Sequence, residues 1–235
     1  YKGETDFWHA DGVAVLSDRL LNAVRRAYAH AVTAVEYDLV FSHSIQQISL
    51  PKRKVSHSDW QSAKQELERL LAIQEEAEAF SDFCRVVHEN ERIEGLPGPY
   101  DSKLHHFVLI KNQQAVIQRY EDQKATPDFA MQLHVVRIGQ AAISFNPFEL
   151  FLDYGQRIKA QSCAEQTFVV QLANGTGGYL PTARAEQAGG YGGLVINGQV
   201  GSQGGDRLVM ETVTAIQRLW SNEENASMGH NPKLH

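Results

Sequence analysis

The chain has 235 residues, of which 43% are hydrophobic and 21% charged. This length and composition can bury a proper core and exclude an intrinsically disordered protein. The formal charge of −6 comes from 22 basic and 28 acidic residues, and without a sustained basic stripe it argues against a nucleic-acid-binding protein. No run of about 18 apolar residues is present to span a membrane. Two cysteines are too few for a disulfide scaffold.

The first 50 residues predict a helix followed by two strands. Apolar residues at helical spacing predict an amphipathic helix over residues 11–31, which we expect to pack on a sheet. Two alternating runs, residues 35–41 and 44–50, predict an antiparallel hairpin that Pro51 ends. The basic run Pro51–Lys54 (PKRK) is interpreted as a solvated exit from the second strand.

Two helices are predicted next. Ser58 and Gln61 have the spacing of a capping box, which predicts the start of a long helix over residues 59–89. The segment Gly95–Pro99 (GLPGP) breaks the helical pattern, and a further helix is expected over residues 102–122.

The second half of the chain alternates strands and helices. Strands are predicted over residues 130–138 and 141–145, joined by a tight turn at Gly139–Gln140. Asn146 is a good N-cap for a helix over residues 147–160. A strand over residues 167–173 then leads into a long loop rich in Gly, Pro and Thr.

These elements predict an α/β fold: one layered domain over residues 1–220, with a mixed, partly antiparallel sheet and flanking helices. The Gly-rich stretch 188–205 is expected to be a mobile loop, and residues 221–235 a disordered tail.

An acid and two tyrosines are the candidate site residues, because they lie at loop positions beside strands. Glu149 could equally serve the cap as the third residue of a helix. Tyr179 could be a loop tyrosine with a buried ring, and Tyr191 could cap its loop. Of ten histidines, only His134, and less so His9, could approach these three residues.

The second half of the chain resembles the C-terminal part of the catalytic domain of neutral/alkaline, non-lysosomal ceramidases and their bacterial relatives. The resemblance covers roughly residues 10–220 and is firmest after Gln132. The matching pieces are NPFELFLDYGQRIKA, TFVVQLANG, GGYLPT, AGGY and GSQGGDRLVMETVTAIQRL.

This resemblance implies a zinc-dependent amide hydrolase. Glu149 matches the zinc-binding glutamate of the family, Tyr179 its zinc-binding tyrosine, and Tyr191 a second tyrosine that contacts the reacting amide oxygen. The implied substrate is an N-acylated sphingoid base or a related amide, and a secreted or periplasmic location would be consistent with the family.

The chain resembles only about half of the family's active site. The family takes two further zinc ligands from histidines, including an HxH stretch, and its nucleophilic serine from a Gly-Asp segment. These motifs precede the matched part, so we expect them in a missing N-terminal segment, without which this chain alone could be inactive. The alternatives are a non-catalytic scaffold and a ligand-binding domain that keeps the fold.

Overall fold

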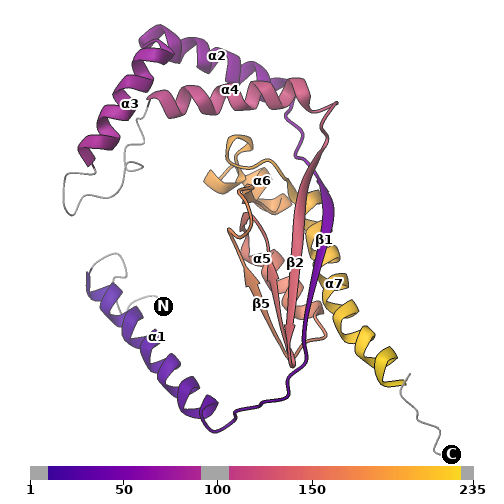
Figure 1. Cartoon of the computed structure of the whole chain (residues 1–235). Coiled ribbons are helices and arrows are strands. Elements are labelled where there is room, and N and C mark those ends of the chain that lie inside the picture. Colours follow the sequence, from indigo (N-terminus) through magenta and orange to yellow (C-terminus); the bar gives the residue numbers. More distant parts are fainter. Residues whose placement is uncertain (1–9, 91–105, 229–235) are drawn as a thin grey trace, which may run out of the picture. The chain divides into compact units, whose positions relative to one another are not determined.

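The structure is a computed structural model that describes residues 10–90 and 106–228 (Figure 1). The chain divides into two compact units, one ending at Val40 and the other starting at Phe41. Helices and a mixed sheet make up the described residues, which confirms the predicted α/β class. The prediction of a single domain over residues 1–220 stays a prediction.

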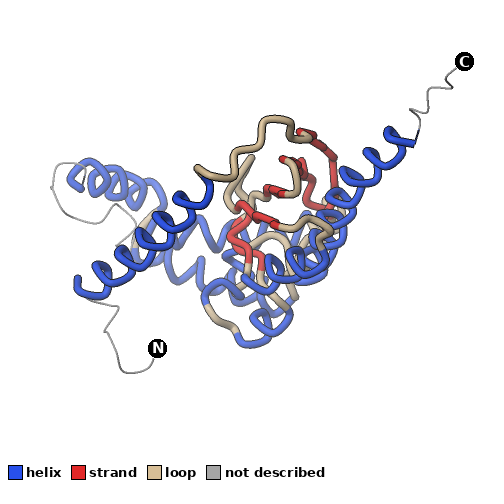
Figure 2. Tube along the Cα trace, turned by 90° about the horizontal axis from the view of Figure 1, so that it is seen from below, coloured by secondary structure: helices blue, strands red, loops and turns tan. Residues whose placement is uncertain are grey.

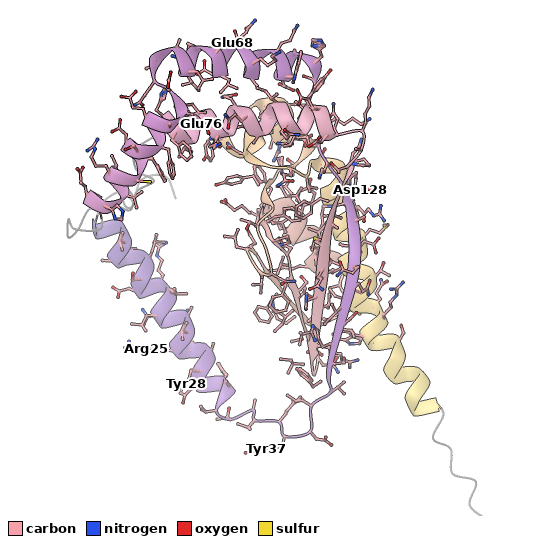
Figure 3. All side chains as sticks on the ribbon, turned by 45° about the horizontal axis from the view of Figure 1, so that its top comes forward. Arg25, Tyr28, Tyr37, Glu68, Glu76 and Asp128 are labelled. Atoms are coloured by element: carbon pink, nitrogen blue, oxygen red, sulfur yellow. The ribbon has the colours of Figure 1, made fainter. Side chains whose placement is uncertain are left out.

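The described residues of the first unit, 10–40, contain one helix. Helix α1 spans Ala10–Ala31, and the helix predicted over residues 11–31 is therefore confirmed. Its apolar residues Val13, Leu20 and Val24 are exposed, and the expectation that they pack on a sheet stays a prediction. The predicted first strand of the hairpin, residues 35–41, is wrong up to Val40, because these residues have no strand partner and Tyr37 is 94% exposed (Figure 3).

The second unit is built on a four-stranded sheet with the order β1-β2-β3-β5. Strand β1 (Phe41–Pro51) pairs antiparallel with β2 (Asp128–Ile138) along its whole length. Strand β3 (Ala141–Phe145) is antiparallel to β2, and β5 (Gln166–Val170) is parallel to β3. The residues predicted to form the second half of a local hairpin thus pair with a strand about 80 residues away in sequence.

Among the described residues of the second unit, helices cover one face of this sheet. Leu50, Leu133 and Val135 point into the main core, where helices α5 (Leu152–Gln161) and α7 (Ser202–Met228) pack. Figure 2 shows α7 running past the strands. The opposite face keeps large apolar side chains exposed, which are Phe41, Ile45, Ile138, Phe168 and Val170.

Three further helices belong to the second unit. They are α2 (His57–Ile73), α3 (Glu76–Asn90) and α4 (His106–Asp122). Glu76, labelled in Figure 3, holds α3 to α4 through an ion pair of 2.5 Å with Lys111 and a hydrogen bond from Gln114.

The prediction of one long helix over residues 59–89 is wrong in two respects. Its pattern splits into α2 and α3 because Gln74 adopts an extended conformation as the C-cap of α2. The N-cap is Ser56 and not Ser58, since Ser56 Oγ accepts from the backbone N–H of Asp59 and Asp59 caps Ser56 in return. The first part of the helix predicted over residues 102–122 lies outside the described residues.

The helix predicted over residues 147–160 is also corrected. Strand β4 (Phe148–Leu150) comes first, and α5 starts only at Leu152. Asn146 does not cap a helix, because its side chain bridges β4 and β5, accepting from the N–H of Phe148 and donating to Val170 O. Glu149 is therefore a strand residue and not the third residue of a helix.

The strand predicted over residues 167–173 ends early. Strand β5 stops at Val170 because Leu172 adopts a left-handed conformation (φ 53°) that cannot continue the ladder. The Gly-rich loop that follows contains a short strand, β6 (Gly178–Leu180), which pairs parallel with β4.

The stretch 188–205 has regular structure over much of its length. Helix α6 (Ala183–Ala188) leads to two single helical turns, η2 (Tyr191–Gly193) and η3 (Val195–Asn197), before α7 starts. Glycine is needed at Gly205 in α7 because an added Cβ would come within 2.5 Å of the Tyr154 hydroxyl. This close approach lets α7 pack against α5.

Helix α7 extends to Met228. The tail predicted over residues 221–235 overlaps its end, and residues 229–235 lie outside the described ones, so the tail stays a prediction. Within the described ranges, no helix is both long and apolar enough to cross a membrane.

Candidate functional site

The two-stranded sheet of β4 and β6 brings Glu149 and Tyr179 together. The strands run parallel with Glu149 directly opposite Tyr179 and the buried Phe148 and Leu150 on either side. Side chains of paired residues lie on the same face of a sheet. Residues 30 positions apart in sequence are thus neighbours, and their predicted roles as zinc ligands stay predictions.

The Glu149 carboxylate is the main influence on the ionisation of Tyr179. It raises the pKa of Tyr179 above its usual value, because a negative acceptor next to the hydroxyl favours the protonated phenol. Partial burial and the negative charge of Glu149 act in the same direction. Tyr179 is therefore a neutral phenol at physiological pH.

Tyr191 completes the group from the turn η2. Its ring meets that of Tyr179 edge-on, with 5.7 Å between the ring centroids and 81° between the planes. The side chain is 71% exposed, and its backbone carbonyl accepts a hydrogen bond of 2.7 Å from the Asn197 side chain. Tyr191 is therefore an exposed residue whose ring lies against that of Tyr179.

Gly192 allows this turn to approach Tyr179. A Cβ added there would lie 2.9 Å from the rings of both Tyr179 and Phe151, closer than real Cβ contacts. The sequence GGYGG is thus a place where backbone passes close to a neighbour, and that neighbour is the ring of Tyr179.

Two arginines far from Tyr191 in sequence donate hydrogen bonds to the turn that carries it and to the residues just after that turn. Arg53 Nη1 donates to Gly193 O over 2.6 Å, and Arg119 Nη1 donates to Val195 O over 2.6 Å. Arg53 belongs to the basic run interpreted as a solvated strand exit, but its side chain is half-buried. Sequence reasoning missed Arg119 altogether, since one arginine in a helix carries no pattern.

His134 has other neighbours. Its ring stacks on that of His43 at 5.3 Å, their ring nitrogens lie 3.1 Å apart, and its second nitrogen is 3.2 Å from the Asn174 amide. None of Glu149, Tyr179 and Tyr191 is among these partners. His9 lies outside the described residues. In the described part of the chain, no group of three or more His, Cys, Asp and Glu residues gathers as metal ligands would.

The chemistry of Glu149 and Tyr179 fits a metal ion in part. A carboxylate and a phenol that can lose its proton offer two adjacent oxygen donors. A catalytic zinc ion usually takes three protein ligands, so the pair accounts for some of the ligands and leaves a place for others.

Comparison with known proteins gives little further guidance. No family profile matches the chain, and no curated protein is significantly similar to it. A solved structure described as "Ceramidase complexed with C2" is weakly similar, with a TM-score of 0.33 and 20% sequence identity. The match covers 36% of this chain and 14% of the length of that chain.

Proposed function

We propose that this chain is part of a zinc-dependent amide hydrolase of the ceramidase type, acting on an N-acylated sphingoid base or a related amide. The observation that carries the proposal is the meeting of Glu149, Tyr179 and Tyr191. The sequence resemblance selected these residues, and the pairing of β4 with β6 and the turn η2 place them in one group.

Each residue has a distinct proposed task. Glu149 and Tyr179 would hold zinc through one oxygen each, the phenol giving up its proton to become a ligand. Zinc, when bound, would polarise the amide carbonyl. Tyr191 would donate its hydroxyl to the oxygen of that carbonyl as negative charge develops on it.

The remaining ligands and the nucleophile would come from a segment N-terminal to this chain. Two oxygen ligands hold zinc weakly, because affinity depends on ligand number and on a preformed site. We therefore expect the 235-residue chain alone to be metal-poor after purification.

Zinc competition with a chromophoric chelator tests the metal assignment. The parent chain should show weak binding that Glu149→Gln and Tyr179→Phe abolish, while Tyr191→Phe should bind as the parent does. Equal zinc affinity in all four proteins would refute the assignment. Stoichiometric, tightly held zinc in the isolated chain would also refute it and point to an unrecognised ligand such as His134.

The second candidate is a non-catalytic domain that keeps the fold. It is favoured by the interaction of Tyr179 with Glu149, which keeps the phenol protonated when no ligand is bound. Adding the complete N-terminal segment and assaying a fluorogenic N-acyl amide separates the two, since only the hydrolase would turn it over.

A further inference from the structure

A cavity in the second unit, which starts at Phe41, is lined by cations. It has a volume of ≈ 270 Å³ and lies where the end of β1, the second half of α4 and Gln199 meet. Lys52 and Arg53 reach it from the segment after β1, and Arg119 from α4. The basic run after β1 is therefore more than a solvated strand exit, because two of its residues line a cavity.

Both arginines are fixed in place by one nitrogen each. Arg53 Nη1 and Arg119 Nη1 donate to carbonyls two residues apart in the same loop, Gly193 O and Val195 O. A guanidinium carries five N–H donors in a rigid fork. Anchoring one nitrogen orients the remaining donors without using them.

Arg119 has an unused donor. Its Nη2 is fully buried and has no hydrogen-bond partner among the described residues. A buried donor without a partner is costly, and it belongs here to a charged group. Burial, followed by the nearby charge of Arg53, lowers the pKa of Arg119. The cost of the charge would fall if an anion occupied the cavity that Arg119 lines.

Two carboxylates lie near the cavity, and their two negative charges do not balance its three cations. Asp122 lines the cavity, but its carboxylate accepts a hydrogen bond of 2.7 Å from Gln118. Glu186 lies 3.9 Å from Arg53 Nε and accepts two hydrogen bonds, from the N–H and the hydroxyl of Ser202, at 2.8 and 3.0 Å. The cavity thus joins three cations with one carboxylate that has another partner.

We propose that this cavity binds a small tetrahedral oxyanion, either free phosphate or the phosphate group of a small molecule, held by Arg119, Arg53 and Lys52. Three cations on two elements suit a doubly charged anion better than a carboxylate. Arginine forks also match phosphate oxygens in geometry. The proposal uses none of the proposed zinc ligands and stands apart from the hydrolase assignment.

Titration of the 235-residue chain with inorganic phosphate at constant ionic strength tests the proposal. The Nε–H signals of Arg53 and Arg119 should shift in a saturable way in NMR spectra, with a dissociation constant below about 1 mM. Arg119→Gln should weaken binding at least tenfold. Arg69→Gln removes the same charge from an exposed ion pair with Glu66 and should bind as the parent does.

The proposal stays testable even if Arg119→Gln folds poorly. Arg119→Lys keeps a charge but lacks the second donor, and it should also bind phosphate more weakly in a chain whose spectrum is otherwise unchanged. Shifts that never saturate, or equal affinity in the Arg119 variants and in Arg69→Gln, would overturn the proposal. Saturable binding of acetate without binding of phosphate would overturn it as well. Titration with glycerol phosphate then shows whether the cavity also binds a phosphate group that belongs to a small molecule.

Discussion

The influence of Glu149 on Tyr179 makes the pair testable without any metal. Because the carboxylate raises the pKa of Tyr179, the phenol should ionise above the usual value of about 10. Absorbance at the phenolate band, compared between the parent and Tyr179→Phe, measures that pKa. In Glu149→Gln the pKa of Tyr179 should fall, whereas Glu165→Gln, remote in the fold, should leave it unchanged.

The same pKa shift fixes a pH dependence of stability. A tyrosine with a raised folded pKa stabilises the fold fully below the unfolded pKa near ~10 and loses that contribution as pH rises through the folded pKa. The stability difference between the parent and Tyr179→Phe should therefore shrink as pH rises above ~10. A difference that grows over this range in urea unfolding experiments would contradict the raised pKa of Tyr179.

The two tyrosines should separate in a complete enzyme. Tyr191→Phe removes a donor that acts in the transition state and should lower kcat by about 10²-fold with little change in KM. Tyr179→Phe removes a proposed ligand and should lower zinc content first. Steady-state kinetics with parallel metal analysis measures both, and unchanged values in both variants would leave them as packing residues.

At the level of elements, the start of α2 offers a matched pair of serines. Ser56 Oγ accepts from Asp59 N over 3.0 Å, whereas Ser58 Oγ contacts only Ser56 Oγ at 3.2 Å. Ser56→Ala should cost about 1 kcal/mol of unfolding free energy. Ser58→Ala should change it by less than about 0.5 kcal/mol. Equal losses in chemical denaturation would place the cap at the wrong serine.

The two faces of the sheet should respond differently to truncation. Leu133 on β2 is 1% exposed, and Ile45 on the adjacent β1 is 56% exposed. Leu133→Ala should cost about 2–5 kcal/mol because it leaves a cavity in the core, while Ile45→Ala should cost less than about 1 kcal/mol. A large loss at Ile45 would mean that the outer face is covered in solution.

Sequence patterns predicted elements best where the pattern is local. The strand over residues 141–145 and the helix over residues 11–31 follow from alternation and helical spacing, and both are confirmed. The pairing of β1 with β2 was not predictable, because alternation does not identify a strand's partner. The helix expected to start at Pro147 failed because the Asn146 side chain joins two strands and does not cap a helix.

The candidate site shows the same contrast between what the sequence predicts and what only the fold reveals. The resemblance selected Glu149, Tyr179 and Tyr191, and the fold brings them together. The arginines that hold the turn were not predictable, since Arg53 and Arg119 act through carbonyls 140 and 76 residues away in sequence. A backbone carbonyl can accept a hydrogen bond whatever its residue type, so no spacing of residue types predicts these contacts.

At the level of the whole molecule, the second unit carries its own core. The buried apolar residues of the three clusters all follow Phe41, starting at Ile48. A chain starting at Phe41 should therefore unfold cooperatively and within a few degrees of the parent, as circular dichroism would show. Loss of cooperative unfolding would mean that the first 40 residues contribute to this core.

Arg137 gives the C-terminal helix a link to the far end of the sheet. Its guanidinium is buried, donates to Gly139 O and Leu219 O over 2.9 Å each, and lies 4.1 Å from the centre of the Trp220 ring. One side chain thus links the β2–β3 turn to a late turn of α7 by hydrogen bonds. Opening either partner exposes a buried charge, so amide protons of the turn and of α7 near Leu219 should exchange with solvent as one cooperative unit.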